Sequence, residues 1–378
     1  MADRNTYARF CEQASDLPVF MQPWYLDAVC TGGHWEVALV EKGGRIVAAL
    51  PYFLKKKWGR QYVAMPPLAR MMGPYLLPEF RRTRKEFSLL EALIDQLPAR
   101  LAAYEQDFHY SAQNWLPFYW RGFRQTTRYS YLLETADLDA VWKNLAPDYR
   151  NQKIPKAQEA TEVRTGLALP EFLKAHNRSY ERQGLRAPVA SALLQRLDEA
   201  LAGHGQREIL YAADRETGAI HSVAYLVWDR HSAYYLMAGD EPALRQSGAG
   251  ILVAWEAIRY TRNVLQLPVF DFAGSMVQSI ERVRRQFGAV QQPYFRVQKE
   301  WSPVWKVGNC KAQMTAKIVI AVPCFSGGNA SSSTPWLEGC NPPPASPCST
   351  RAAMSTSKFV AIPQRADAIV NTAIDSRK

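Results

Sequence analysis

The sequence lacks a long apolar run. No stretch approaches the roughly 20 uncharged apolar residues that a membrane-spanning helix needs. The opening residues, MADRNTYARFCEQASD, are polar and acidic where a secretory signal would be apolar. We therefore expect a cytoplasmic protein without a transmembrane segment. A sustained heptad repeat is also missing, which argues against a long coiled-coil arm.

Cysteines and histidines are few and scattered. Cys11 and Cys30 lie far apart near the start, and the other four of the six cysteines fall in the last segment without CxxC spacing. The six histidines stand singly, so they indicate no Ser/His/Asp triad. We expect no disulfide framework, no zinc site and no other bound metal.

Positive charge is in excess. The formal net charge is +11 at pH 7, of which the segment from Cys310 onward supplies +4 and the rest of the chain +7. A basic body suits phosphate-bearing ligands such as coenzyme A, nucleotide sugars, lipid phosphates or RNA. A solvated basic surface without a ligand is the alternative. RNA is a minor alternative because the sequence holds no RNA motif, and DNA is not expected as a partner.

Two stretches share one pattern of strands and turns. The first begins at Trp35, WEVALVEKGGRIVAALPYFLKKKWGRQYVAMP, and turns at Gly43-Gly44. The second begins at Arg207, REILYAADRETGAIHSVAYLVWDRHSAYYLMAGD, and turns at residues 216–218. Each predicts a three-stranded antiparallel meander. Their similarity indicates an internal duplication of one α/β unit, with chance similarity between two hairpin-rich regions as the alternative.

Helical periodicity flanks both meanders. It predicts a helix over residues 87–106, helices over EFLKAHNRSYERQG and ASALLQRLDEALAGHG, and a helix over GAGILVAWEAIRYTRNVLQ after the second meander. A strand, LPVFDFAG, follows. The order predicts an α/β (α+β) fold of two tandem domains, residues 1–125 and 126–308, each a mixed, mostly antiparallel sheet flanked by helices.

Residues 309–378 differ in composition. SGGNASSSTPWLEGCNPPPASPCSTRAAMSTS is rich in Ser, Pro, Gly and Asn and has neither a helical nor a strand period, so it predicts a disordered tail. MTAKIVIAVPCF resembles the buried first strand of an α/β domain that does not follow. Our hypothesis is that this tail is frameshifted or comes from an overlapping downstream reading frame.

A glycine-rich turn joins the second meander to the helix after it. In ALRQSGAGILVAWEAI, Arg245, Gly248 and Gly250 fit the spacing R/Q-x-x-G-x-G/A. Such a turn presents backbone N–H groups at the positive end of a helix and can hold a pyrophosphate. Ordinary turn chemistry is the alternative. The residues predicted to bind a phosphate-bearing donor are Arg245, Gln246, Ser247, Gly248, Ala249 and Gly250.

Asp271 lies between Phe270 and Phe272 in an apolar run. Its carboxylate therefore faces a cavity or a partner on the opposite face of the strand. The candidate partners are an acceptor's amine or hydroxyl, a backbone amide, or one of Arg282, Arg284 and Arg285. In the alternative interpretation, Asp271 and Ser275 cap the helix that begins near Met276.

The order of these motifs resembles the FemAB-like branch of the GNAT acyltransferase superfamily. FDFAGSM, IERVRRQFGA and PYF are similar to the signature near the end of these acyltransferases. PVFMQPWYLDAV, LPYF and PPLARMMGPYL are similar to their N-terminal half. The resemblance covers residues 1 to about 305 and implies tandem GNAT-like domains with the chemistry in the second.

The resemblance also implies substrate-binding residues. The basic segment DYRNQKIPKAQEA places Arg150, Lys153 and Lys156 on one helical face, although Pro155 should break that helix or shift its start. HNRSYERQGLRAP is similar to the substrate-facing segment of the family. The predicted substrate-binding residues are Arg150, Lys153, Asn177, Tyr180, Arg182, Gln183, Ser275 and Arg285.

Together these features predict an acyltransferase. It would move an acyl group from acyl-CoA, such as acetyl-CoA, or from another activated carrier to an amine or hydroxyl of a cell-envelope or polysaccharide precursor. Tyr235, Asp271 and Glu281 are the predicted proton-handling residues. An acyl carrier protein and a charged tRNA are alternative donors. The alternative functions are an aminoacyl-tRNA-dependent peptidoglycan-bridge transferase and a non-catalytic binding protein of the same fold.

Overall fold

The computed structural model describes residues 4–301 except 182–183, 186, 188 and 275. Strands in this part of the chain form one 12-stranded sheet with the order β1-β2-β3-β5-β12-β6-β11-β10-β9-β8-β7, and β4 pairs with β2. Every described residue belongs to one compact unit. The tail predicted from residue 309 lies outside the described residues.

The first half of the described chain supplies one end of the sheet and the helices around it. Its helices are α1 (Arg4–Gln13), α2 (Pro23–Val29), α3 (Lys85–Asp95) and α4 (Leu116–Trp120), with short 3-10 turns at Val19–Met21 and Pro78–Phe80. Its strands are β1 (His34–Lys42), β2 (Arg45–Lys57), β3 (Arg60–Ala64), β4 (Tyr75–Leu76), β5 (Leu101–Asp107) and β6 (Arg124–Glu134).

The second half supplies the other end of the sheet and its own helices. Its helices are α5 (Leu138–Asn144), α6 (Ile154–Ala160), α7 (Leu169–Glu181), α8 (Ser191–Gly203), α9 (Ala249–Asn263) and α10 (Gln278–Gln286), with a π turn η3 (Tyr149–Lys153) and a 3-10 turn η4 (Arg245–Ser247). Its strands are β7 (Thr161–Arg164), β8 (Arg207–Asp214), β9 (Ile220–Trp228), β10 (Ser232–Asp240), β11 (Val269–Asp271) and β12 (Val290–Glu300).

Both predicted meanders are present. β1-β2-β3 and β8-β9-β10 are antiparallel, and the turns fall where the glycines predict them. Gly43 and Gly44 both have positive φ, as a tight hairpin between twisted strands requires. In each half a helix then leads to a strand that pairs in parallel with the last strand of the meander, β5 with β3 and β11 with β10. The duplicated α/β unit and the tandem arrangement are therefore confirmed.

The helix predicted over residues 87–106 is wrong in its second part. Helix α3 ends at Asp95, and Leu101–Asp107 form strand β5, which lies between β3 and β12. Ala102 and Ala103 favour a helix locally, but Pro98 separates them from α3. Pairing on both edges inside a sheet outweighs that local preference, because helix propensity is only a weak determinant.

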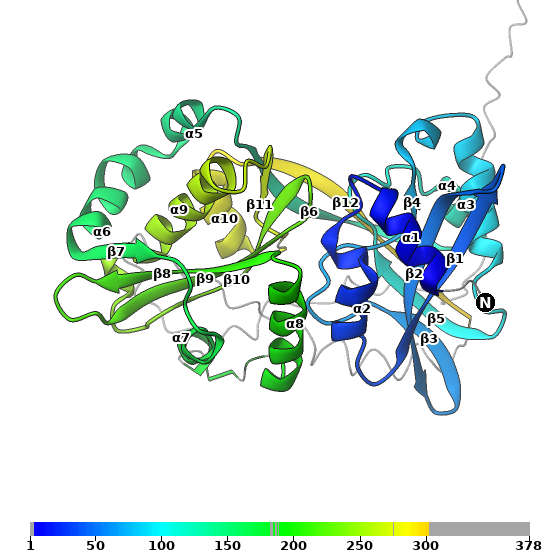
Figure 1. Cartoon of the computed structure of the whole chain (residues 1–378), viewed down its shortest axis with the longest axis horizontal. Coiled ribbons are helices and arrows are strands. Elements are labelled where there is room, and N and C mark those ends of the chain that lie inside the picture. The colour runs from blue at the N-terminus through cyan, green and yellow to red at the C-terminus, as the bar shows by residue number, and fades with distance from the viewer. Residues whose placement is uncertain (1–3, 182–183, 186, 188, 275, 302–378) are drawn as a thin grey trace, which may run out of the picture. The chain divides into compact units, whose positions relative to one another are not determined.

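The last strand of each half is inserted into the sheet of the other half. β12 pairs with β5 of the first half through Arg296–Glu300 and Ala103–Asp107. β6, the last strand of the first half, pairs with β11 of the second. β6 and β12 also pair with each other over most of their length, and Figure 1 shows β12 running between the two groups of elements. Neither half completes its sheet from its own residues.

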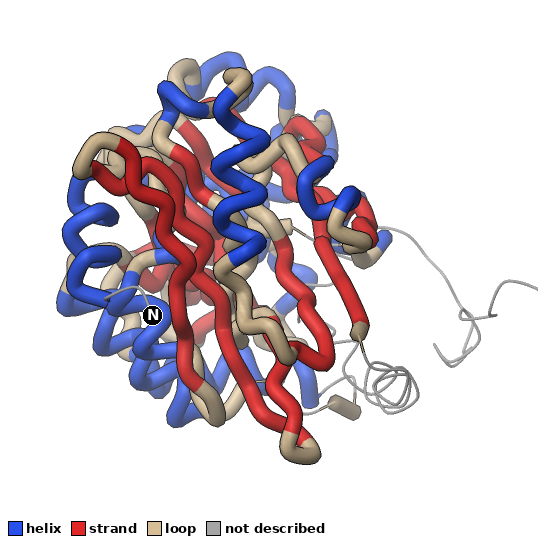
Figure 2. Tube along the Cα trace, turned by 90° about the vertical axis from the view of Figure 1, so that its right-hand side faces the viewer, coloured by secondary structure: helices blue, strands red, loops and turns tan. Residues whose placement is uncertain are grey.

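Helices cover both faces of the second half's strands (Figure 1), and Figure 2, viewed from the side of the first half, shows the strands lying between helices. Along β9, Ala224 and Leu226 pack in a core cluster with α9, while Val223, Tyr225 and Val227 pack in another cluster with α7 and α8. Successive strand residues point to opposite faces, which explains why β9 is apolar at almost every position. We call these the α9 face and the α7 face of the sheet.

The two halves pack directly on each other at the α7 face. Tyr25 and Val29 of α2 belong to the same core cluster as the inner residues of α7 and α8. The Val19 N–H donates to the buried Asp229 carboxylate at 3.3 Å. Because β6 begins at Arg124, the predicted boundary at residue 126 falls inside a shared strand, and the division into residues 1–125 and 126–308 stays a prediction.

Candidate active site

Strands β10 and β11 part in the middle of the second half. They pair in parallel only at Ser232–Tyr234 and Val269–Asp271, where β11 ends. β10 continues to Asp240 and shifts its register against β9 between Tyr235 and Met237. Beyond Tyr234, the edge of β10 that faced β11 has no strand beside it among the described residues. The parting, which we call the fork, opens the sheet beside Asp271.

Asp271 stands at the fork and is fully buried. Its Oδ1 accepts hydrogen bonds from the Ser130 hydroxyl and from the Ala273 N–H, the latter at 2.7 Å. Its Oδ2 is buried without a hydrogen-bond partner within the described part of the chain. Burial raises the pKa of Asp271 from 3.8 to about 6, although both hydrogen bonds favour the charged form. A carboxylate with this pKa is mostly ionised at neutral pH and suited to accept a proton.

The alternative interpretation, in which Asp271 caps the following helix, is wrong. The N-cap of α10 is Val277, which makes no side-chain capping bond. The chain between them turns back through Ala273 and Gly274, both at positive φ. A Cβ on Gly274 would lie 3.2 Å from the Tyr129 carbonyl and 3.2 Å from the Tyr294 hydroxyl. A close turn therefore holds the Asp271 carboxylate at the end of the strand.

Two arginines interact electrostatically with Asp271: Arg284, one of its predicted candidate partners, and Arg70, which no sequence pattern indicates. Arg284 of α10 is only 7% exposed, and its Nη1 has no hydrogen-bond partner among the described residues. Burial lowers the pKa of Arg284 to about 10. Arg70 comes from the first half, and its Nη2 donates to the Leu236 carbonyl of β10 at 2.6 Å. Burial also lowers the pKa of Arg70.

Only one of the three predicted proton-handling residues lies on the α7 face. Ser130 contacts Asp271, whereas the next residue, Tyr131, donates to Glu281 at 3.0 Å from the α9 face. Tyr235 packs in the α9 cluster, against Phe270 and Phe272. The period-two alternation of strands therefore separates Asp271 from Tyr235 and Glu281.

Tyr235 and Glu281 have different surroundings. The Tyr235 hydroxyl is buried without a described hydrogen-bond partner, and burial raises its pKa. The phenol stays protonated at neutral pH, so it can donate a hydrogen bond but not take a proton. Glu281 forms an ion pair with Arg285 at 2.7 Å, and Arg285 is largely exposed. This pair is one helical turn apart on α10 and faces solvent.

The predicted substrate residues of α7 lie next to the fork. The His176 ring is hydrogen-bonded to the Ala238 carbonyl at 2.9 Å, and the Ser179 hydroxyl donates to the Asp240 carbonyl at 2.9 Å. Tyr180 is buried against the His176 ring and close enough to influence the Arg70 pKa. Asn177 is partly buried. Three further predicted positions, Arg182, Gln183 and Ser275, lie outside the described residues.

The glycine-rich turn contacts the predicted basic segment. Gly248 has φ +80°, and a Cβ there would lie 2.9 Å from the Lys153 carbonyl. Lys153 itself forms an ion pair with Asp148 at 2.6 Å. Pro155 sits in the first turn of α6, so the helix begins later than an unbroken segment would, as predicted. Arg150 instead donates to the Lys143 carbonyl at 2.9 Å.

Several N–H groups of the turn are already hydrogen-bonded. Ser247 N–H donates to the Leu244 carbonyl at 3.1 Å, and Ala249 N–H donates to the Ser247 hydroxyl at 3.3 Å. The Ser247 hydroxyl also contacts His221 Nδ1 at 3.0 Å. Of the remaining predicted positions, Gln246 is exposed and Gly250 is buried at the positive end of α9. The turn thus offers fewer free donors than the sequence implies.

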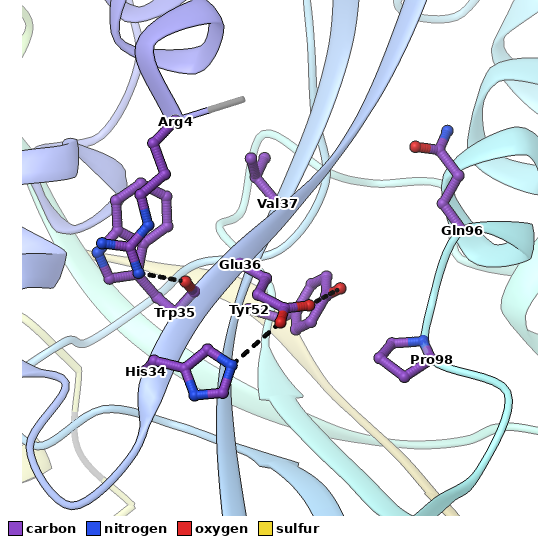
Figure 3. Close-up of a pocket in the computed structure, with 8 residues that line it drawn as sticks. All are labelled: Arg4, His34, Trp35, Glu36, Val37, Tyr52, Gln96 and Pro98. Carbon is purple, nitrogen blue, oxygen red and sulfur yellow. Dashed lines mark hydrogen bonds and ion pairs between the residues drawn. The ribbon is translucent and has the colours of Figure 1, made fainter. Parts of the chain in front are cut away.

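A separate hollow of about 570 Å³ lies in the first half (Figure 3). Its polar groups bond to one another: Glu36 accepts from the Tyr52 hydroxyl at 2.9 Å and contacts His34 Nε2 at 3.0 Å. Arg4 donates to the Trp35 carbonyl at 2.8 Å. Because these groups satisfy each other, we place the candidate site at the fork instead.

The described part of the chain contains no helix long and apolar enough to cross a bilayer. Cys11 and Cys30 are free thiols, and the other four cysteines lie outside the described residues.

Residues 149–297 match the protein family described as "Acetyltransferase (GNAT) domain". A comparison with curated proteins finds no match. The match covers the second half up to β12 and includes the fork, the glycine-rich turn and α10. The second half therefore carries a GNAT acetyltransferase domain.

The structure is similar to several solved structures. FemX is 12% identical, with 78% of this chain and 96% of that chain covered and a TM-score of 0.62. A tandem GNAT protein from the clavulanic acid biosynthesis pathway is 14% identical, with 80% and 96% covered and a TM-score of 0.51. The C-terminal domain of a putative lysylphosphatidylglycerol synthetase from Agrobacterium fabrum is 12% identical, with 86% and 100% covered and a TM-score of 0.52. At these low identities the TM-scores show a shared fold alone, and this fold confirms the predicted tandem GNAT-like architecture.

Proposed function

From the GNAT acetyltransferase domain in residues 149–297, we propose that the chain is an acyltransferase that moves an acyl group from a thioester donor, acyl-CoA, to an amine or hydroxyl of a small or envelope-precursor acceptor. The fork carries this proposal, because it places a buried carboxylate with one unused oxygen where β10 and β11 separate. A fold alone would not license a reaction class, since one fold serves many functions.

The proposed reaction needs one proton acceptor. The acceptor nitrogen or oxygen bonds to the acyl carbon, the carbon–sulfur bond breaks, the thiolate leaves, and Asp271 takes the proton that the nucleophile loses. The pKa of Asp271, raised by burial to about 6, favours this transfer near neutral pH. Holding the reactants together at the fork supplies the remainder of the rate enhancement.

The glycine-rich turn is the proposed contact for the donor's phosphates. Gln246 in the 3-10 turn η4 and Gly250 in the first turn of α9 would offer main-chain N–H groups, and the Lys153 carbonyl lies against Gly248. The Lys153 ammonium group forms an ion pair with Asp148 and is therefore neutralised in part. We therefore expect moderate affinity for a free acyl-CoA.

Gly248→Ala is expected to weaken acetyl-CoA binding by at least about tenfold, or about 1.4 kcal/mol. The new Cβ would meet the Lys153 carbonyl at 2.9 Å, and the backbone already has φ +80°, so the turn must change shape. Isothermal titration checks this. Gly218→Ala is the matched control, because Gly218 has φ +70° but nothing within 4 Å of the new Cβ. Equal affinity in all three proteins would reject the turn as the phosphate contact.

Acceptor-dependent release of free thiol tests the proposed reaction. The purified protein is incubated with a panel of amines and with acetyl-CoA, an acyl carrier protein thioester or a charged tRNA. We expect thiol release from acetyl-CoA, release that is at least about 10²-fold slower in the Asp271→Asn variant, and acylated product seen by mass spectrometry. Release of free tRNA without thiol would favour the aminoacyl-tRNA-dependent alternative, and no turnover with any donor would favour the non-catalytic one.

A further inference from the structure

Three charged side chains with buried polar atoms lie near the fork without forming an ion pair with one another. They are Asp271 on β11, Arg284 on α10 and Arg70 from the loop after β3. Each has one buried polar atom without a hydrogen-bond partner in the described chain, namely Asp271 Oδ2, Arg284 Nη1 and Arg70 Nε. Each also influences the pKa of at least one of the others. No ion pair joins any two of them among the described residues.

Buried arginines normally have a carboxylate partner, because an unpaired buried charge is costly. Arg296 shows the usual arrangement: its guanidinium donates to both oxygens of Asp107, at 2.6 Å and 2.8 Å, and these contacts raise its pKa. Arg70 and Arg284 have lowered pKa values instead. They resemble donors prepared for a ligand more than structural ion pairs.

The other carboxylates near this cluster are already engaged. Asp107 serves Arg296 and also lies 3.8 Å from Arg128. Asp229 accepts from the His231 and Ser232 N–H groups and from the Tyr234 hydroxyl, each at 2.8 Å. Two cations therefore face one available carboxylate. The cluster keeps one excess positive charge, which an anionic group would neutralise.

We propose that Arg70 and Arg284 bind an anionic group of the acceptor, a carboxylate or a phosphate, and that Asp271 Oδ2 receives the acceptor's amine. This rests on the proposed function for the assignment of the nucleophile. The acceptor is then a small molecule that carries both an amine and an anionic group. A guanidinium group suits a carboxylate or a phosphate, because two of its parallel N–H groups match the spacing of two oxygens of the anion.

The position of Arg70 explains why the acceptor site needs both halves of the chain. Arg70 donates to the Leu236 carbonyl of β10, just beyond the residues of β10 that pair with β11. Arg70 as a whole is partly exposed, although its Nε atom is buried. A ligand can therefore approach the Arg70 side chain. Arg284 approaches the same carboxylate from α10, over the Phe272 ring at 5.9 Å. The acceptor would lie between a loop of the first half and a helix of the second.

Simple anions test the proposed role of Arg70 and Arg284 in the absence of an acyl donor. Thermal unfolding is followed at constant ionic strength in chloride, acetate and phosphate. We expect acetate or phosphate to raise the melting temperature of the wild type, and Arg70→Met or Arg284→Met to weaken the apparent affinity at least about tenfold. Whichever anion stabilises more identifies the group. Arg282→Met is the control, because Arg282 lies exposed on the same helix and should keep the wild-type response.

The proposed contact between Asp271 and the acceptor's amine is tested with carboxylates that also carry an ammonium group. Glycine, β-alanine and 4-aminobutyrate are compared with acetate by titration. At least one should bind about tenfold more tightly than acetate to the wild type, and this preference should disappear in Asp271→Asn.

Two results would overturn the inference: no response of the wild type to acetate, phosphate or the amino acids, or an undiminished response in both arginine variants. Anion binding without thiol release would reject the proposed reaction but keep the anion site. Thiol release without any anion response would keep the proposed reaction but reject the anion site.

Discussion

Asp271→Asn is expected to lower turnover by about 10² to 10⁴-fold while raising the free energy of unfolding above about pH 6. Asparagine can still accept from Ser130 and Ala273 at the position of Oδ1, so the turn should survive. What disappears is the proton acceptor at Oδ2. Turnover of the wild type should also fall as the pH drops below about 6, because the carboxylate then becomes protonated.

The sign of the stability change follows from the raised pKa. Burial raises the pKa of Asp271 from 3.8 to about 6 in the folded protein, so the unfolded chain loses this proton first. The wild type therefore loses stability as the pH rises from about 4 to about 6, and asparagine does not titrate. The gain of the variant should grow across that range to at most about 3 kcal/mol.

Urea unfolding of both proteins at several pH values measures this gain, and the thiol-release assay measures turnover. Ser130→Ala is a useful companion, because it removes one hydrogen bond from Oδ1 but keeps the carboxylate. It should raise the pH at which turnover falls without abolishing turnover. An Asp271→Asn protein with activity within a few-fold of wild type would exclude Asp271 as the proton acceptor.

Val297→Asp is expected to destabilise the first half by at least about 3 kcal/mol, although Val297 belongs to the last strand of the second. Val297 is fully buried on β12 and packs in the first half's core cluster with Trp35, Val63 and Tyr104. An aspartate there would place an unpaired charge between apolar side chains. Loss of hydrogen-exchange protection in β1, β2 and β3 would report the effect.

Val290→Asp is the matched control for this substitution. Val290 begins the same strand but is 69% exposed, so an aspartate there should change the free energy of unfolding by at most about 0.5 kcal/mol. If Val297→Asp exposed only amides of the second half, the strand exchange would not have the energetic importance that the pairing indicates.

The sequence predicts the repeated unit because its turns and helices depend on residues that are close together in the chain. The turns at Gly43-Gly44 and Gly218 and the apolar periodicity of α9 involve neighbours in sequence. Strand β5 was mistaken for helix because its alanines favour a helix and its strand character depends on β3 and β12. No local sequence pattern indicates that β6 and β12 each insert into the sheet of the other half.

Part of the candidate site also has a local signal in the sequence. Asp271 was recognisable as a lone carboxylate between two phenylalanines. Arg284 also had a local signal, because it lies on the apolar face of α10 with Ile280, Val283 and Phe287. Arg70 had none, since only the packing of the two halves brings it to β10. Tyr235 and Glu281 fell on the other face because sequence does not show how neighbouring strands are aligned.

The exchanged strands also constrain how the chain can acquire its structure during synthesis. Arg296 pairs with Asp107 across a separation of 189 residues, so β5 has no neighbour on one edge until β12 has left the ribosome. Until then the first half exposes an open strand edge and an incomplete core, the features that invite aggregation. Contacts of such long range also slow folding. A nascent chain that stalls before residue 290 should therefore depend on chaperones more than either half's size suggests.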